Sequence, residues 1–328
     1  MAQQRVRVGW IGAGRFSRSR LLPAFKRIPG VDLAVIANSG EESSGRVAQE
    51  FGFERTASDW RQVIAATDID AVVVGTQPPL HRELCVAALE AGKHVLTLNA
   101  IAPTLEEAKD MARVAAQKPQ LVNLVYPGQF YLRHDADMRA LLQEGFVGEP
   151  LHVIDHWYTP FFGLGTQYEV VGRWVGEHKR VFAHRRVFEG AAAPAVPGRG
   201  PSRRELNVVV TELDNGCTVT YLHGSITTGL ARIEVHGSQG RLVHYSEGQA
   251  QEGILGAKSG EADLRPVVPS AGELGPVEVE AQFIAAIRGE LVAYPAVGSF
   301  ADGARMMEFT QAWRASLDQG AWCDLPPR

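Results

Sequence analysis

The chain has 328 residues, of which 45 % are hydrophobic and 21 % are charged. This composition is typical of a folded globular protein of about two domains, and it excludes a disordered chain and a coiled coil. The 33 basic and 37 acidic side chains give a formal net charge of −4, which argues against nucleic acid or an anionic membrane as a partner.

The three cysteines, Cys85, Cys217 and Cys323, are widely spaced and odd in number. They match neither a disulfide framework nor a zinc site, so we expect a reducing compartment and no bound metal. The first residues contain no apolar signal region, and no run of about 18 apolar residues occurs in the chain. The sequence therefore predicts a cytoplasmic protein without a membrane segment.

The first 125 residues alternate short apolar runs with helical patterns. The runs are nearly continuous in Val, Ile, Leu and Ala, as in strands that are buried on both faces of a parallel sheet. Strand, helix and strand in series require right-handed crossovers, which produce a doubly wound α/β layer. The predicted strands are residues 6–11, 31–37, 71–75, 94–98 and 120–125.

After Pro150 the pattern changes to strands joined by short turns. Asp214, Asn215 and Gly216 form one hairpin signal, because Asn and Gly tolerate positive φ. Hairpin-linked strands favour a largely antiparallel sheet in a second domain. A C-terminal helix at 299–319 is expected to pack through Met306, Phe309, Trp313 and Leu317. The predicted strands are residues 151–159, 181–188, 206–212, 217–225, 232–236 and 241–245, with loops at 190–202 and over most of 247–275.

The clearest chemical motif is the turn after the first predicted strand, Gly12-Ala13-Gly14. Gly12 allows a tight turn, Gly14 lets the backbone approach a pyrophosphate, and the following helix offers unpaired N–H groups to that anion. Ser17 stands where a third glycine is usual and is still small enough for close packing of helix on strand. The strand before the motif and the crossover after it predict a dinucleotide-binding loop.

The end of the second predicted strand bears on the choice of dinucleotide. A carboxylate at that point would bind the ribose hydroxyls of NAD. Here the strand ends in Asn38 and Ser39, while Asp32 lies at its other end. Asn38 and Ser39 can hydrogen-bond a 2′-phosphate, and Arg15 or Arg46 can add positive charge, so the sequence favours NADP over NAD.

Residues 70–81 (DAVVVGTQPPLH) and 87–96 (AALEAGKHVL) carry further motifs, as do residues 145–150, 233–242 and 283–289. Together they closely resemble the glucose–fructose oxidoreductase / inositol dehydrogenase (Gfo/Idh/MocA) family. The resemblance implies a Rossmann domain at 1–125 and an α+β domain at 126–328 with a large, mostly antiparallel open sheet. Its final helix can pack back on the first domain, and its sheet often forms homodimers or homotetramers. Such proteins are NAD(P)-dependent oxidoreductases of sugars, cyclitols and related small molecules.

The glycine loop and the resemblance together define the expected cofactor-binding residues. Thr76, Gln77 and Pro78 follow a buried strand, and His81 opens the next helix as a structural or cofactor-adjacent residue. The full expected set is Gly12, Gly14, Arg15, Phe16, Asn38, Ser39, Thr76, Gln77, Pro78, His81 and Asn99.

The family's catalytic positions carry different residues in this chain. The usual Glu-Lys-Pro motif has Asn99 in place of Lys, and the second motif has Gln167 in place of His, with no carboxylate at either usual Asp. A shifted alignment would make His178 the replacement. Asn99 and Gln167 can donate hydrogen bonds but cannot shuttle a proton at neutral pH. Tyr126, at the end of a predicted parallel strand, is the preferred proton donor, and a tyrosine that only packs at the domain interface is the alternative.

Three functions remain open on these grounds. The first is an NAD(P)-dependent oxidoreductase with a remodelled site, acting on a small molecule such as an imine, an enone or a modified sugar. The second is a non-catalytic sensor or partner protein that binds a nicotinamide dinucleotide or a metabolite. The third is an enzyme that uses the scaffold for a non-redox elimination or isomerisation. Fold resemblance does not decide among them, and the oxidoreductase is preferred.

Overall fold

The computed structural model describes residues 4–126, 133–158, 164–192, 203–227, 230–247, 251–276, 278–291 and 298–327. The chain forms two compact units. The first comprises Met1–Phe130 and Val277–Arg305, and the second comprises Tyr131–Pro276 and Met306–Arg328. Each unit is described by itself below.

The first unit is built on a six-stranded sheet in which every paired strand is parallel to its neighbour. The strand order β3-β2-β1-β4-β5-β6 is that of a doubly wound Rossmann sheet. The strands are β1 (Val6–Ile11), β2 (Val31–Ala37), β3 (Arg55–Thr56), β4 (Ala71–Val74), β5 (His94–Leu98) and β6 (Asn123–Tyr126). The predicted parallel sheet is confirmed, and three of its strands have the expected bounds.

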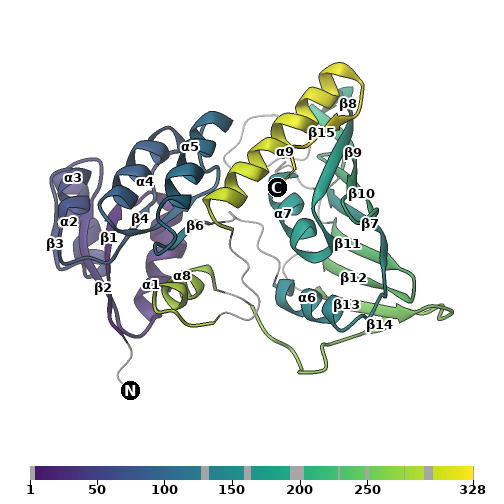
Figure 1. Ribbon diagram of the computed structural model, residues 1–328, viewed down its shortest axis with the longest axis horizontal. Helices are drawn as coiled ribbons and strands as arrows, with labels where there is room; N and C mark the ends of the chain where they lie inside the picture. Colours follow the sequence, from purple (N-terminus) through teal and green to yellow (C-terminus); the bar gives the residue numbers. More distant parts are fainter. Residues whose placement is uncertain are drawn as a thin grey trace. The chain divides into compact units, whose positions relative to one another are not determined.

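Helices connect these strands and cover the sheet, as the purple and blue half of Figure 1 shows. Val6, Val8 and Trp10 of β1 are fully buried, as expected for a central strand with helices on both faces. The helices are a π-helical turn η1 (Ser17–Leu21), α1 (Leu22–Arg27), α2 (Glu41–Phe51), α3 (Trp60–Ala65), a 3-10 turn η2 (Pro78–Leu80), α4 (His81–Glu90) and α5 (Leu105–Ala116).

A late segment of the chain returns to the first unit. Helix α8 (Val279–Ile287) contributes Val279, Phe283 and Ile284 to the core of the Rossmann sheet. Figure 1 shows α8 beside α1, about 250 residues earlier in the sequence, and the rings of Phe25 and Phe283 lie 6.4 Å apart. A single domain boundary near residue 125 would place α8 in the second domain, whereas its apolar face packs in the core of the first unit.

The second unit is built on a nine-stranded sheet, ordered β14-β13-β12-β11-β7-β10-β9-β8-β15. Only the β7–β10 pair is parallel among the pairs described, so the expected mostly antiparallel sheet is confirmed. The strands are β7 (Pro150–Tyr158), β8 (His178–Ala192), β9 (Arg203–Leu213), β10 (Thr218–Gly224), β11 (Leu230–Gly237), β12 (Gly240–Glu247), β13 (Gln251–Lys258), β14 (Arg265–Pro266) and β15 (Cys323–Asp324).

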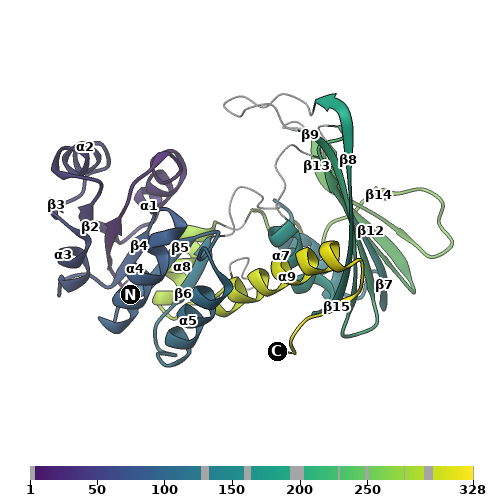
Figure 2. The same cartoon turned by 90° about the horizontal axis from the view of Figure 1, so that it is seen from above.

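Helices α6 (Asp135–Gln143), α7 (Leu164–Val175) and the later part of α9 (Phe300–Gln319) pack on one face of this sheet. Figure 2 shows α7 and α9 on that face, and no described helix on the other. Met306, Phe309 and Trp313 of α9 are buried in the core, and Leu317 packs against it, as their spacing predicts.

The expected loop over most of residues 247–275 is wrong, because β13 and β14 lie within it. Strand β13 pairs with β12 along its whole length, although Gly253 and Gly256 give it a weak strand signal. A Cβ atom at Gly256 would lie 2.7 Å from the ring of Phe146. This glycine therefore makes room for an aromatic ring, a need that no local sequence pattern reveals.

Within the described ranges, no helix is both long and apolar enough to cross a membrane. In the same ranges, no cluster of three or more His, Cys, Asp or Glu side chains is arranged to hold a metal ion.

Candidate dinucleotide site in the Rossmann unit

The glycine loop lies at the carboxyl end of β1, between β2 and β4. The Gly12 N–H donates to the carbonyl of Ala37 (2.9 Å), and Gly12 has a φ of +81°. A Cβ atom there would lie 2.6 Å from Cγ2 of Thr76, so only glycine fits this turn. A Cβ atom at Gly14 would meet no heavy atom within 4 Å, so the backbone at Gly14 faces open space.

Asn38 holds this loop in place from the end of β2. Its Oδ1 accepts from the N–H of Ala13 (3.2 Å), and its Nδ2 donates to Oγ of Ser43 (2.9 Å). The N–H of Asn38 itself donates to Oγ of Ser44 (2.9 Å). Asn38 therefore orders the loop with its amide, and Ser39, which is exposed, is left to face solvent.

An open groove of about 590 Å³ runs along these residues. Its one carboxylate, Glu50, pairs with Arg18 at 2.5 Å, and Arg15 adds a second positive charge. Arg46, expected from the sequence to supply charge here, pairs instead with Glu42 (3.0 Å). The groove is lined by Ala13, Gly14, Arg15, Arg18, Ser19, Asn38, Ser39, Ser43 and Glu50.

The groove fits the phosphate-bearing half of a dinucleotide. Gly14 leaves the backbone open where an anion approaches a helix start, and the two arginines and three serines supply positive charge and hydrogen bonds. The volume is within the range of known small-molecule sites. Gly12, Gly14, Arg15, Asn38 and Ser39 are thus brought together as the sequence predicts, and Arg18 joins them.

A second cavity, of about 220 Å³, lies at the carboxyl ends of β4, β5 and β6. In open α/β sheets, ligands bind at these strand ends. Asn99, just after β5, and Tyr126, the last residue of β6, both line it, and the N–H of Asn99 donates to the carbonyl of Tyr126 (3.1 Å). The lining is completed by Phe16, Thr76, Gln77, Pro78, His81 and Leu98, so all the remaining expected cofactor-binding residues meet here.

His81 is fully buried and ties together the two loops that border this cavity. Its Nε2 lies 3.0 Å from the carbonyl oxygen of Thr76, and its Nδ1 lies 3.1 Å from those of Ala100 and Ile101. Burial lowers the pKa of His81, while the three carbonyl oxygens oppose this effect. The contacts give His81 a structural role, and its ring also forms part of the cavity wall.

Tyr126 is 2 % exposed, and its hydroxyl oxygen accepts a hydrogen bond from Nε of Arg20 (3.0 Å). The edge of the Phe16 ring packs on it, with ring centroids 5.4 Å apart. Burial and the negative charge of Glu280 raise the pKa of Tyr126, while Arg20 lowers it. Sequence reasoning missed Arg20, because it lies in η1, 106 residues from Tyr126.

The second unit holds the other predicted catalytic position. Gln167 on α7 is 2 % exposed, and its Oε1 accepts no hydrogen bond from any described residue. His178, which a shifted alignment would make the replacement for the family histidine, is also buried in this unit. It lies on β8 with its Nδ1 2.9 Å from Oγ1 of Thr211 and its ring 4.4 Å from that of Tyr168. Gly163, which stands at the first usual Asp of the second family motif, and residues 127–130, where relatives often carry an Arg, lie outside the described ranges.

A buried histidine–aspartate pair lies on the helix-covered face of the second sheet. Nε2 of His223 on β10 lies 3.0 Å from Oδ2 of Asp155 on β7, and both residues are at most 1 % exposed. The pair was not expected from the sequence. Its one signal is a carboxylate at a core-facing position of an alternating strand, between Val153 and Trp157.

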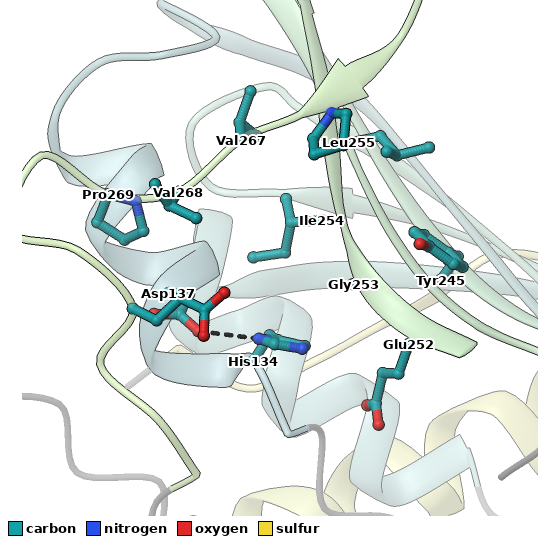
Figure 3. A pocket seen from close by; sticks show the side chains of 12 residues that line it. His134, Asp137, Tyr245, Glu252, Gly253, Ile254, Leu255, Val267, Val268 and Pro269 are labelled. Atoms are coloured by element: carbon teal, nitrogen blue, oxygen red, sulfur yellow. Dashed lines mark hydrogen bonds and ion pairs between the residues drawn. The ribbon is translucent and has the colours of Figure 1, made fainter. Parts of the chain in front are cut away.

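The second unit also contains a cavity of about 200 Å³ between α6 and the β12–β14 edge (Figure 3). His134 lies at its base with Nδ1 2.9 Å from Oδ2 of Asp137, and Glu252 lies on the facing strand. The backbone N–H of Leu274 also donates to Asp137 (2.7 Å). The polar groups at the base are therefore paired within the protein, and Ile254 and Val267 form an apolar wall.

The sheet order, the glycine loop and the two cavities at the strand ends are those of a dinucleotide-binding Rossmann unit. Residues 6–126 match the family model of the Gfo/Idh/MocA oxidoreductases, described as having an NAD-binding Rossmann fold. The chain belongs to this family and is an enzyme of its kind, which acts on a small molecule with a nicotinamide dinucleotide. The resemblance predicted from the motifs is confirmed, and the non-catalytic and non-redox alternatives are set aside.

Two relatives match most of the chain. A 1,5-anhydro-D-fructose reductase of Ensifer adhaerens is 30 % identical over 254 residues, which cover 72 % of this chain and 75 % of the relative. A dTDP-3,4-didehydro-2,6-dideoxy-alpha-D-glucose 3-reductase of Saccharopolyspora spinosa is 32 % identical over 251 residues, 73 % of this chain and 74 % of the relative. A structure of levoglucosan dehydrogenase in complex with NADH and L-sorbose has the same fold. Its TM-score is 0.77 at 24 % identity, and the match covers 99 % of this chain and 100 % of that one.

Proposed function

We propose that this protein is an NADP-preferring reductase of a small, polar carbonyl compound, with a modified sugar as the first candidate class. An imine or an enone is the alternative acceptor. The observation that carries the proposal is that Tyr126, whose phenol can donate a proton, lines the cavity at the strand ends together with Asn99. A bound nicotinamide supplies the hydride in such a reaction. The residues of the chain must then bind the acceptor and supply the proton.

Tyr126 is suited to give a proton, and the residues at the family's catalytic positions are not. The amides of Asn99 and Gln167 can orient an oxygen atom by hydrogen bonding but cannot release a proton at neutral pH. Burial raises the pKa of Tyr126, so its phenol keeps its proton at neutral pH, the form that a general acid in a reduction requires. Asn99, half-buried in the same cavity, is placed to hydrogen-bond the acceptor.

The relatives support a carbohydrate-derived acceptor as the first to test. Two of them are named as reductases, of 1,5-anhydro-D-fructose and of a keto-deoxysugar nucleotide. Levoglucosan dehydrogenase and inositol dehydrogenases are also among the relatives. An electrophilic acceptor such as an imine would need less help from a general acid. A substrate panel should therefore contain keto-sugars, imines and enones.

The test of Tyr126 is the variant Tyr126→Phe, which removes only the hydroxyl. We expect kcat for reduction to fall by about 10²-fold, with the affinity for the dinucleotide unchanged. Tyr245→Phe, which removes a hydroxyl from the cavity of Figure 3, is the matched control and should keep full activity. Undiminished turnover in Tyr126→Phe would exclude Tyr126 as the proton donor.

The NADP preference rests on the charges of the 590 Å³ groove. Among the described residues its one carboxylate, Glu50, is paired with Arg18, and Arg15 and Ser39 line the wall beyond the end of β2. We expect NADPH to bind more tightly than NADH by about tenfold or more, as measured by fluorescence titration. Arg15→Gln should weaken NADPH binding alone, and Ser39→Asp should favour NADH. Tighter binding of NADH by the wild-type protein would refute the preference.

We also propose that the helix-free face of the nine-stranded sheet joins copies of the chain into a homodimer or a homotetramer. Ile154, Val208, Val210 and Leu222 lie on neighbouring strands of this face and are half-buried although no described helix covers them. Light scattering coupled to gel filtration should give a mass of two or four chains. Leu222→Arg should reduce it to one chain, whereas a wild-type monomer would exclude this interface.

A further inference from the structure

Two side chains from other elements act on Tyr126 at the end of β6, Arg20 through a hydrogen bond and Glu280 through its charge. Arg20 comes from η1, Tyr126 from β6 and Glu280 from α8. Nε of Arg20 donates to the hydroxyl oxygen of Tyr126 (3.0 Å). Glu280 is 2 % exposed, and its Oε1 has no hydrogen-bond partner among the described residues. A buried carboxylate oxygen that accepts no hydrogen bond is costly.

The contact with Arg20 bears on whether the phenol of Tyr126 can donate its proton to a ligand. A guanidinium donates hydrogen bonds and accepts none, so Arg20 cannot take the phenolic proton. The hydroxyl of Tyr126 accepts from Arg20, and its own hydrogen has no acceptor among the described residues. Tyr126 lines the adjacent 220 Å³ cavity, and an acceptor bound there is the partner that we assign to this hydrogen.

We propose that Arg20 and Glu280 are positioning residues that set the acidity of Tyr126 from opposite sides. Arg20 stabilises the phenolate through its charge and its hydrogen bond, and Glu280 destabilises it. This inference rests on the proposed role of Tyr126 as proton donor. It adds two residues outside the family's catalytic motifs, on η1 and α8, and assigns opposite effects to them.

Atoms and charge balance in the proposed proton transfer from Tyr126 to the acceptor. When the carbonyl carbon of the acceptor takes up a hydride, which a bound reduced nicotinamide would supply, the Oη–H bond of Tyr126 would break and a new O–H bond would form on the product alcohol. The negative charge left on Tyr126 faces the guanidinium of Arg20. A proton from water then restores the phenol. Arg20 thus stabilises the charge that develops on the donor.

The electrostatics of the surrounding elements agree with these signs. Burial and then Glu280 raise the pKa of Tyr126, Arg20 lowers it, and Glu278 adds a smaller upward effect. The hydrogen bond to Tyr126 raises the pKa of Arg20, and burial raises that of Glu280. Glu278 lies 3.7 Å from Arg27 of α1, and both are exposed. The other charged groups near Tyr126 are therefore farther out and better solvated.

The first experiment measures the acidity of Tyr126 without substrate or dinucleotide. Full-length protein labelled with ¹³C at Cζ of tyrosine is titrated by NMR between about pH 8 and 11.5, and Tyr126→Phe identifies the resonance. We expect Arg20→Gln to raise the titration midpoint by about one pH unit and Glu280→Gln to lower it by a similar amount. Arg20→Lys, which keeps the charge, should restore most of the shift. Arg27→Gln is the matched control and should leave the midpoint in place.

The second experiment measures the pH profile of kcat for reduction. Arg20→Gln should lower the plateau by about threefold to tenfold and move the basic limb to higher pH, with a smaller change in KM. Glu280→Gln should move the limb to lower pH. Unchanged midpoints in both variants would overturn the inference whatever the role of Tyr126. Shifted midpoints together with full turnover in Tyr126→Phe would show that Arg20 and Glu280 set the acidity of Tyr126 but that Tyr126 is not the proton donor. The proposed function would then fail, and the two residues would have no effect on catalysis through Tyr126.

Discussion

Gly14→Ala should separate cofactor binding from folding, because the structure leaves space for the added methyl group. No heavy atom lies within 4 Å of a Cβ atom at Gly14, and its φ is not positive. We therefore expect the free energy of unfolding to change by no more than about 0.5 kcal/mol. The methyl group would, however, occupy the open side of the loop, where a pyrophosphate must approach the backbone.

The expected loss of affinity follows from the hydrogen bonds that the methyl group blocks. A hydrogen bond to a charged group contributes about 1.5–3 kcal/mol. Loss of one such bond weakens binding by about 10- to 100-fold. Fluorescence titration with NADPH gives the Kd, and thermal unfolding without ligand gives the stability of the same sample.

Two glycines serve as controls for this prediction. A Cβ atom at Gly75 would lie 2.4 Å from the carbonyl oxygen of Gly12 and 2.5 Å from Oγ of Ser17. Gly75→Ala should therefore destabilise the protein by about 1–3 kcal/mol. Gly45, inside α2, has open space around its Cβ position, and Gly45→Ala should leave both Kd and the unfolding midpoint near wild type or slightly raise the latter. Wild-type affinity in Gly14→Ala would refute a pyrophosphate at this loop.

Three further predictions concern stability and chemistry. Burial lowers the folded-state pKa of His81 below its ordinary 6.5, so below about pH 6.5 the unfolded chain binds a proton that the folded chain does not. Stability should therefore decrease as the pH falls below this value, and His81→Gln should flatten that dependence in thermal melts, whereas an unchanged slope would contradict it. Asp59 caps α3 by accepting from the N–H groups of Arg61 (2.7 Å) and Gln62 (3.2 Å), so Asp59→Ala should cost about 1 kcal/mol in chemical denaturation, against no change for Asp59→Asn. The double variant Asn99→Lys, Gln167→His restores the residue types of the family's proton relay and should give sugar-alcohol oxidation above the wild-type rate; no gain would mean that more than these two side chains has been lost.

The strands of the Rossmann unit were predictable because their burial on both faces produces a local pattern of apolar residues. A strand with helices on both faces is apolar throughout, so 6–11, 31–37 and 94–98 coincide with β1, β2 and β5. The strands of the second sheet were harder to predict from the sequence. These strands have one covered face, and β13 contains Gly253 and Gly256, which read as loop residues. Phe146 requires Gly256 there, and that contact joins residues 110 positions apart.

The sequence by itself determined the class of protein, the dinucleotide loop and the residues at the carboxyl ends of the parallel strands. These depend on short motifs, because a glycine turn or the last residue of a strand is defined by its immediate neighbours. Only the tertiary structure decided which charges face them. Arg18 took the place expected for Arg46, and Arg20 and Glu280 were brought to Tyr126 from η1 and α8. The physical reason is that electrostatic and hydrogen-bond partners are chosen by distance in space, and crossovers and returning helices set that distance.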